Sequence, residues 1–212
     1  IHEGMRASDG AIERIDIEGE KVLVQVIGNQ KPIGICGSGI LDAVAEMRKN
    51  DIINERGNFN PACSRVRGDG KEREFVLVQQ EHSGSNRDIV ITRKDINEIL
   101  LAKAAIQTGI EILLRTAGIT SPEEVDRILI AGAFGTYLDV HSAIRIGMLP
   151  DLPVERFSQI GNAAGSGARM MLISDDMRRK GTEFASKSNY VELTTYPAFQ
   201  EVYVQSLRFP EN

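Results

Sequence analysis

The sequence predicts an α/β fold with a mixed sheet, into which a smaller α+β subdomain is inserted. Three observations predict it. Apolar and polar residues alternate near the start of the chain, short apolar runs lead into glycine-rich turns, and helical apolar spacing begins after each of these turns. Alternating strands and helices of this kind are typical of α/β proteins.

The first element is a predicted β-hairpin with strands at about residues 11–16 and 21–27. Apolar and polar side chains alternate on both sides of a tight glycine turn at Gly19. This alternation has the period of half-buried strands. The glycine-rich turn GICGSG, residues 34–39, comes next. Helical spacing follows it, so a helix is expected to begin near Ser38.

The next segment begins irregularly and then predicts two short strands, EFVLVQQ and DIVIT, before the clearest helix of the chain. Thr92 and Asp95 have the spacing of a capping box at its start, and Gly118 is a normal C-terminal residue. We therefore assign residues 1–48 and 119–212 to a core lobe and residues 49–118 to an inserted outer subdomain.

Two strand–turn–helix units follow. The run ILIA predicts a buried strand that leads into the turn AGAFG, residues 131–135, and then a helix from about Val140 with Asp139 as its N-cap. SPEEVDR, just before it, has the pattern of a helix start. FSQIGNAAGSGARMMLIS repeats the unit. Near the end, YVELTT predicts a strand and residues 197–207 an amphipathic helix.

Composition excludes several classes of function. The 212 residues carry a net charge of −5 with no long basic run, which speaks against nucleic acid or an anionic membrane as partner. No apolar run approaches the roughly 20 residues that span a bilayer. Two cysteines are too few for an iron–sulfur cluster, which usually needs about four, and the default compartment is a reducing cytoplasm. No metal-ligand spacing is found. The chain begins with Ile1 and is interpreted as a piece of a longer protein.

Two single side chains, Lys103 and Cys36, are expected to have ordinary structural roles. Lys103 lies off the apolar stripe of its helix and is expected to be solvated, unless it faces a ligand cleft. Cys36 has no basic or histidine neighbour in the sequence and is expected to be a small buried residue.

Three glycine-rich turns, at residues 34–39, 131–135 and 161–167, each open a helix. Without a Cβ, backbone can approach a ligand closely, and the first N–H groups of a helix suit phosphate. One such turn is ordinary turn geometry, but three in this layout favour a nucleotide site. None is a Walker loop or a Gly-x-Gly-x-x-Gly fingerprint, so common kinase and dehydrogenase functions lose support.

Four segments carry a family resemblance: LIAGAFGTYLDVHSAIRIGMLPDLP, QIGNAAGSGARMMLIS, ITRKDINEILLAKAAIQTGIEILL and GICGSGILDAV. Together they resemble the C-terminal part of the reductive activators of corrinoid proteins, ATP-dependent enzymes of the acetate and sugar kinase/Hsp70/actin superfamily. A more distant resemblance is to the ATPase activators of 2-hydroxyacyl-CoA dehydratases, whose Cys-Ala-Ala-Gly-Thr-Gly turn is similar to residues 36–39.

The resemblance implies an actin-like, ribonuclease H-like ATPase fold of two lobes with ATP in the cleft between them, this chain forming most of the second lobe. The turn at residues 161–167 would open the helix that packs back against the first lobe. The residues implied at the nucleotide are Gly37, Ser38 and Gly39 on the phosphate or ribose side, Gly132, Ala133, Phe134 and Gly135 in the adenosine-side loop, and Lys103 on the long helix, with Glu98 as the alternative to Lys103. Catalytic residues stay unassigned.

The resemblance also implies a function. The parent protein would use ATP with Mg²⁺ and an iron–sulfur domain outside this chain to return a Co(II) corrinoid protein of a methyltransferase system to Co(I). The Asp-x-Gly-Thr phosphate loop is absent from these residues, so the fragment alone is expected to be inactive. A homodimer is left open. The alternatives are a docking module for a corrinoid protein that holds no nucleotide, a dehydratase activator, and a small-molecule kinase of the same superfamily.

Overall fold

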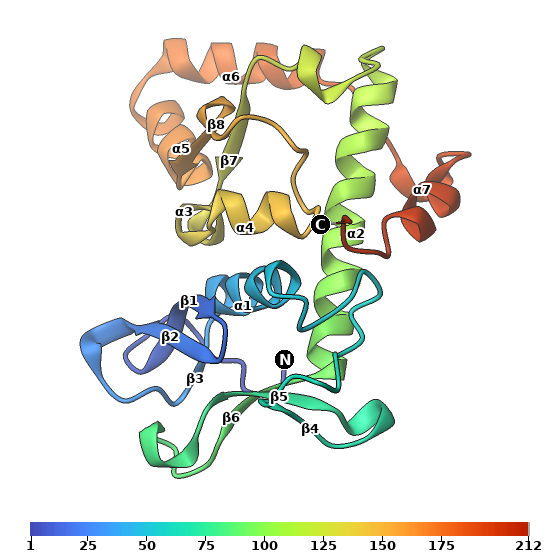
Figure 1. Ribbon diagram of the computed structural model, residues 1–212. Helices are drawn as coiled ribbons and strands as arrows, with labels where there is room; N and C mark the ends of the chain where they lie inside the picture. The colour runs from blue at the N-terminus through green and yellow to red at the C-terminus, as the bar shows by residue number, and fades with distance from the viewer. Residues whose placement is uncertain (212) are drawn as a thin grey trace.

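The computed structural model describes residues 1–211 and contains three small sheets with helices packed around them. Two of the sheets lie with α1 and the lower half of the long helix α2, and the third lies at the other end of the molecule (Figure 1). The helix α2 runs along one side and connects the two ends.

The predicted hairpin is confirmed as β1, Ala11–Glu18, and β2, Lys21–Val26, which pair antiparallel. Gly19 in the turn has a φ of 60°, the left-handed conformation that glycine adopts without strain. A short strand β3, Gly34–Ile35, pairs parallel with the start of β1, so the sheet β2–β1–β3 is mixed, as the sequence predicts.

Helix α1, Gly37–Lys49, begins one residue earlier than expected and packs against β1. Its approach to the strand requires glycine at one position. A Cβ built on Gly39 would lie only 2.2 Å from the carbonyl oxygen of Ile12. The glycine therefore lets the helix backbone lie directly on the strand.

Residues 49–118 contain an antiparallel sheet of β4, Val66–Arg67, β5, Glu74–Val78, and β6, Ile89–Thr92. It ends in α2, Arg93–Thr116. The capping box is confirmed: the hydroxyl of Thr92 accepts from the Asp95 amide at 3.2 Å, and the Asp95 carboxylate accepts from the Thr92 amide at 2.9 Å.

One buried hydrophobic cluster joins the hairpin, α1 and the inserted segment. It contains Ile12 from β1, Met47 from α1, Phe75 from β5 and Ile96 from α2, all fully buried. The boundaries at residues 48 and 118 fall at the C-terminal ends of α1 and α2, and the cluster runs across the first of them. Side chains from both segments therefore stabilise each other.

At the other end of the molecule, β7, Ile128–Ala131, pairs parallel with β8, Phe157–Gly161. The expectation that β7 is buried is wrong for this chain. The side chains of β7 alternate between a half-buried and an exposed face of the sheet, and Leu129 on the exposed face is 56% exposed. The helix start predicted at SPEEVDR forms a single 3-10 turn, Pro122–Glu124.

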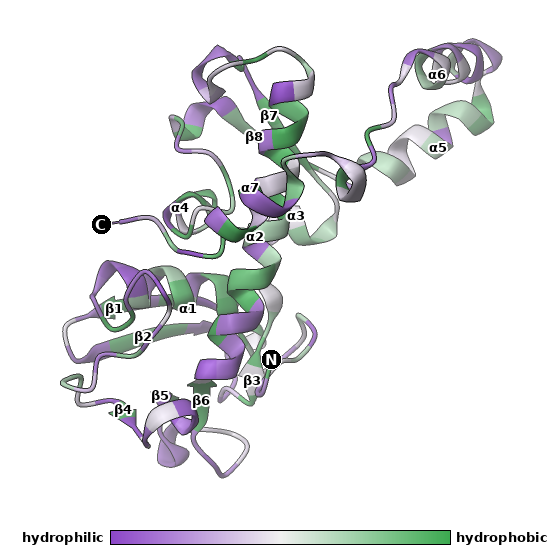
Figure 2. Ribbon diagram, turned by 90° about the vertical axis from the view of Figure 1, so that its right-hand side faces the viewer, coloured by the Kyte–Doolittle hydropathy of each residue, from purple (hydrophilic) through white to green (hydrophobic). Residues whose placement is uncertain are grey.

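Two short helices, α3, Ala133–Tyr137, and α4, Val140–Arg145, connect β7 to the second unit. After β8 come α5, Ala163–Ile173, and α6, Asp175–Lys187. These two pack against each other and project from the rest of the molecule (Figure 2). None of their residues is buried.

The C-terminal residues return to α2. The strand predicted at YVELTT is wrong: this segment forms a 3-10 turn, Leu193–Thr195, since no partner strand of the described chain lies beside it. The predicted amphipathic helix is confirmed as α7, Phe199–Gln205, which packs against α2.

The tail after α7, residues 206–210, is bound at three points. Its carbonyl oxygens accept hydrogen bonds from the ammonium of Lys103 and from the guanidinium of Arg48. The amide of Phe209, which is 3% exposed, donates to the carbonyl of Glu55 at 2.8 Å. The tail therefore fastens together α1, α2 and the loop after α1.

No helix among the described residues is both long enough and apolar enough to cross a membrane.

Candidate functional site

Two of the glycine-rich turns meet at one edge of the sheet β7–β8. The strands are parallel, so their carboxyl ends lie together and both turns follow directly. The amide of Gly132 donates a hydrogen bond of 2.7 Å to the carbonyl of Gly161. In the second turn, the side chain of Asn162 caps α5 by accepting from the amide of Gly165 at 2.9 Å. The sheet therefore joins two turns that are about thirty residues apart in the sequence.

Gly132 exposes backbone at this edge. Its φ is 98°, a conformation that other residues adopt only with strain, and a Cβ at this position would meet no atom within 4 Å. The next two residues, Ala133 and Phe134, are exposed. Gly135 is different: it is buried, and a Cβ there would lie 2.6 Å from the side chain of Ile130. Gly132 is thus required by conformation and Gly135 by packing.

Phe134 brings the third glycine turn to the same place. A Cβ built on Gly37 would lie 3.0 Å from the phenyl ring, so the ring rests on the backbone at the start of α1. Phe134 is still 50% exposed, and Gly37 is exposed too. The structure thus brings together four of the eight residues expected at the nucleotide: Gly37, Gly132, Ala133 and Phe134.

Ser38 and Gly39 lie in the same turn but point into the protein. Ser38 is 5% exposed, and its Oγ lies 3.3 Å from the Sγ of Cys36. Cys36 is 2% exposed, so the expectation of a small buried cysteine is confirmed. Gly39 packs on β1 as described above. These residues shape the turn from behind.

Lys103 is neither solvated nor near these turns, which corrects the first expectation for it. It is 1% exposed, and its ammonium donates to the side chain of Gln107 at 2.9 Å and to the carbonyl of Arg208. Burial lowers the pKa of Lys103 to about 8. Its partner is the C-terminal tail, more than one hundred residues later in the sequence, which no local pattern could indicate.

The sequence analysis missed an ionic cluster that joins elements carrying two of the turns. Arg14 of β1 lies between two carboxylates, with its Nη1 3.4 Å from Asp42 Oδ2 and 3.3 Å from Asp139 Oδ2. Asp139 caps α4 as predicted, because its Oδ1 accepts from the amide of Ser142 at 2.8 Å.

Asp42 is the buried member of this cluster, at 4% exposure. Burial raises the pKa of its carboxyl, against the lowering effects of the Ser142 hydroxyl and the Arg14 guanidinium, and Asp139 adds to the rise. The Oδ1 atom is buried and accepts no hydrogen bond of standard geometry from the described residues. An aspartate on the buried face of α1, next to Leu41, was the one sequence feature that could have indicated this cluster.

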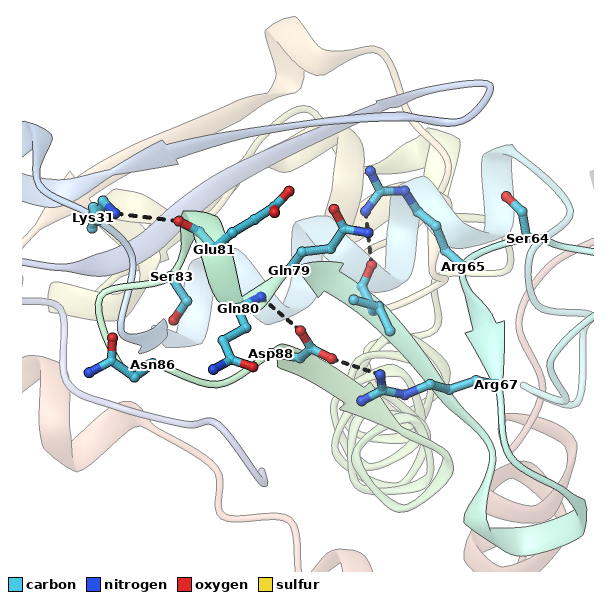
Figure 3. A pocket seen from close by; sticks show the side chains of 11 residues that line it. Lys31, Ser64, Arg65, Arg67, Gln79, Gln80, Glu81, Ser83, Asn86 and Asp88 are labelled. Atoms are coloured by element: carbon cyan, nitrogen blue, oxygen red, sulfur yellow. Dashed lines mark hydrogen bonds and ion pairs between the residues drawn. The ribbon is translucent and has the colours of Figure 1, made fainter.

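A separate polar cavity of about 720 Å³ lies over the sheet β4–β5–β6 (Figure 3). Its charged groups are bound to neighbours: Arg67 pairs with Asp88 at 2.7 Å, and Lys31 donates to the carbonyl of Glu81 at 3.4 Å. None of the glycine turns lines it. Among residues 1–211, no group of three or more His, Cys, Asp or Glu side chains is arranged to hold a metal ion.

Comparison with known proteins gives the family. The family described as the C-terminal domain of RACo, the ASKHA domain, matches residues 1–212. The chain belongs to this family. The chain is also similar to the corrinoid activation enzyme RamQ of Eubacterium limosum, with 38% identity over 218 residues that cover 99% of this chain and 37% of RamQ.

Two further similarities agree with it. The [Co(II) methylated amine-specific corrinoid protein] reductase of Methanosarcina barkeri is 24% identical over 233 residues, 99% of this chain and 39% of the reductase. A solved structure of a reductive activator for a corrinoid, iron–sulfur protein superposes with a TM-score of 0.89 at 39% identity, covering 99% of this chain and 34% of that one. The actin-like fold of an ASKHA domain is therefore established. The chain spans between a third and two fifths of the length of these relatives.

Proposed function

We propose that this ASKHA domain binds ATP for a parent protein that reactivates a corrinoid protein by reduction. The observation that carries the proposal is the meeting of three glycine turns: Gly132 bonds to Gly161, and Phe134 rests on Gly37. Together they form an open surface of accessible backbone. An adenosine group has an apolar face that could stack on the ring of Phe134 and polar edges that backbone groups could bind.

Within this proposal the eight residues have different roles. Gly132, Ala133 and Phe134 would contact the adenosine directly, and Gly37 would line its phosphate or ribose side. Ser38, Gly39 and Gly135 would hold the two loops in shape, because each is buried against neighbouring residues. Lys103 would act only at a distance, through the packing of α2 against the tail.

The fit of ATP to this surface rests on Gly132. It is half-buried, and the space beyond its α-carbon is open, so a ligand could approach its backbone closely. Mg²⁺ would arrive with the phosphates and take its remaining ligands from outside the described residues, among which no group of three or more His, Cys, Asp or Glu side chains is arranged to hold a metal ion. The Asp-x-Gly-Thr phosphate loop would also come from the rest of the parent protein.

The proposed reaction is the transfer of one electron to a Co(II) corrinoid, which becomes Co(I). An iron–sulfur domain of the parent would supply the electron, since this chain has only two cysteines. ATP binding and hydrolysis can drive the step by changing how the lobes and the partner fit together. The names of the relatives favour a corrinoid protein over a dehydratase as the partner.

We also propose how the residues of this chain divide between a core lobe and an outer subdomain. Residues 1–48 and 119–212 would form the core lobe, and residues 49–118 an outer subdomain of the nucleotide cleft. The helix α5, with no buried residue, would pack on the first lobe of the parent. The partner would belong to a methyltransferase system in the cytoplasm, and the parent could be tested for a homodimer by sedimentation.

The substitution Gly132→Val in the parent protein tests the proposal. It should weaken ATP binding at least about tenfold, because a branched side chain blocks the surface and strains a φ of 98°. Isothermal titration with ATP and Mg²⁺ measures the change. Gly118→Val is the matched control: Gly118 also has a positive φ and open space around it, but it ends α2.

Equal affinity in wild type and Gly132→Val would overturn the assignment of the adenosine loop. A wild-type parent that binds no nucleotide at all would instead favour the docking module. Loss of binding in both valine variants would mean that general backbone strain explains the effect.

A further inference from the structure

The ionic cluster of Asp42, Arg14 and Asp139 joins elements that carry two turns of the proposed nucleotide surface. Asp42 is in the second turn of α1, the helix that begins at Gly37. Asp139 follows α3, the helix that carries Phe134. Arg14 comes from β1 and contacts both carboxylates. The cluster therefore connects the element of one ligand turn to the element of the other.

The elements that carry the two turns contact each other in three ways. At the surface, the ring of Phe134 rests on Gly37. Second, Arg14 ties Asp42 to Asp139. The third is the apolar packing of α4 on α1, in which Ala143 and Ile146 are fully buried. Phe134 would itself contact the ligand, so the ionic cluster is the polar contact between the two elements that stays in place when a ligand binds.

The ion pair of Arg14 with Asp139 joins the hairpin to the start of α4. A cavity of about 430 Å³ lies between the hairpin, α1 and α4, and all three side chains of the cluster line it. At this cavity the charges of the cluster, in place of close apolar packing, set the distance between Arg14 and Asp139.

The cluster also lowers the stability of the fold. Asp42 is a nearly buried carboxylate with one oxygen that accepts no hydrogen bond of standard geometry, and such a group destabilises a protein relative to a neutral side chain of the same shape. A side chain kept for stability alone would not have this property. Groups that cost stability are typical of functional sites.

We propose that Asp42 is a positioning residue for nucleotide binding, which acts through Arg14 and Asp139 to hold the adenosine-side loop in register with the turn at Gly37. This inference rests on the proposed function. It assigns Asp42 no contact with the nucleotide.

The test uses Asp42→Asn in the intact parent protein, with two measurements. ATP affinity, by titration calorimetry, should fall by about tenfold, which is within the coupling range of charged residues in contact. Thermal stability without nucleotide should stay the same or rise, because the amide removes a buried charge. Opposite directions in the two measurements are the signature of a positioning role, since a purely structural role would lower both.

Two further variants sharpen the test. Arg14→Gln should weaken ATP binding to a similar degree, and the double variant should be no weaker than either single one. Glu46→Gln is the matched control: Glu46 lies one turn further along α1 and accepts from the amide of Ile17, outside the cluster. Its ATP affinity should equal that of the wild type.

The outcomes separate this inference from the proposed function. If the wild type binds ATP and Asp42→Asn binds it equally well, the positioning role is wrong while the proposed function stands. A parallel loss of affinity and stability in Asp42→Asn also overturns the positioning role. If the wild type does not bind ATP, the proposed function itself fails.

Discussion

Helices α1 and α5 begin in the same way, at a glycine-rich turn after a strand, yet they end in opposite environments. Ten of the thirteen residues of α1 are buried, and none of the eleven residues of α5 is. The sequence of α5 is nevertheless the more apolar, with Met170, Met171, Leu172 and Ile173 in succession. An apolar pattern thus indicates that a helix packs against another element, but it does not indicate which element that is.

The surroundings explain the difference. α1 lies between β1 and α4, and its side chains join the buried cluster. α5 contacts α6, whose surface is charged (Figure 2). The ion pairs of α6, such as Lys187 with Glu183 at 2.6 Å, are exposed and stabilise the protein little. Most of the length of the relatives lies outside the part that this chain matches. We expect the element that packs on α5 to belong to that remaining part of the parent protein.

The largest contrast is expected between two phenylalanines. Phe75 is fully buried in β5, whereas Phe184 in α6 is 78% exposed. Phe75→Ala should lower the free energy of unfolding by about 3–5 kcal/mol through a buried cavity, and Phe184→Ala by less than about 0.5 kcal/mol. Chemical denaturation of the chain measures both. Similar losses would show that α6 is packed more firmly than its exposure indicates.

Two glycines give the next contrast. Gly39→Ala should destabilise by about 2–3 kcal/mol, because the added methyl group meets the Ile12 carbonyl at 2.2 Å. Gly167→Ala, inside α5 with open space around it, should stabilise by up to about 1 kcal/mol through helix propensity. Thermal unfolding compares them. A neutral Gly39→Ala would mean that α1 can move away from β1 at little cost.

The smallest contrast concerns buried and exposed lysines. The pKa of Lys103 is lowered to about 8 from 10.5, so between these pH values the unfolded chain binds more protons than the folded one. The stability of wild type relative to Lys103→Met should therefore rise with pH from about 8 to about 10, by at most about 1.4 kcal/mol per unit. Urea denaturation at several pH values tests this, with Lys187→Met as the control for loss of a lysine charge. A pH-independent difference would contradict the burial of a charged Lys103.

Local patterns predicted the elements whose causes are local. The capping box of Thr92 and Asp95, the glycine turn of the hairpin and the periodicity of α1 all depend on residues within a few positions of each other. The strand expected at YVELTT failed because a strand needs a partner, and no strand of residues 1–211 pairs with this segment. The exposed face of β7 was missed for another reason: exposure depends on which elements cover the sheet, and the residues of β7 do not encode that.

The candidate site was predictable in part. Glycine spacing indicated the turns, and the structure then showed that Phe134 joins the turn at Gly37 to the two at the edge of the sheet. The ionic cluster depends on three residues that are far apart in the sequence: Asp42 follows Arg14 by 28 residues, and Asp139 follows Asp42 by 97. No short pattern connects positions so far apart. The prediction that Lys103 is solvated failed for the same reason, because its partner lies in the distant C-terminal tail.

The tail also has a consequence for the order of folding during synthesis. Arg48 and Lys103 are made early, but their carbonyl partners in Pro210 and Arg208 are among the last residues of the segment to leave the ribosome. Until then, two buried cations lack these acceptors, and the side of the core that Phe209 covers is open to water. This side of the core is therefore expected to close only when residues 208–210 dock.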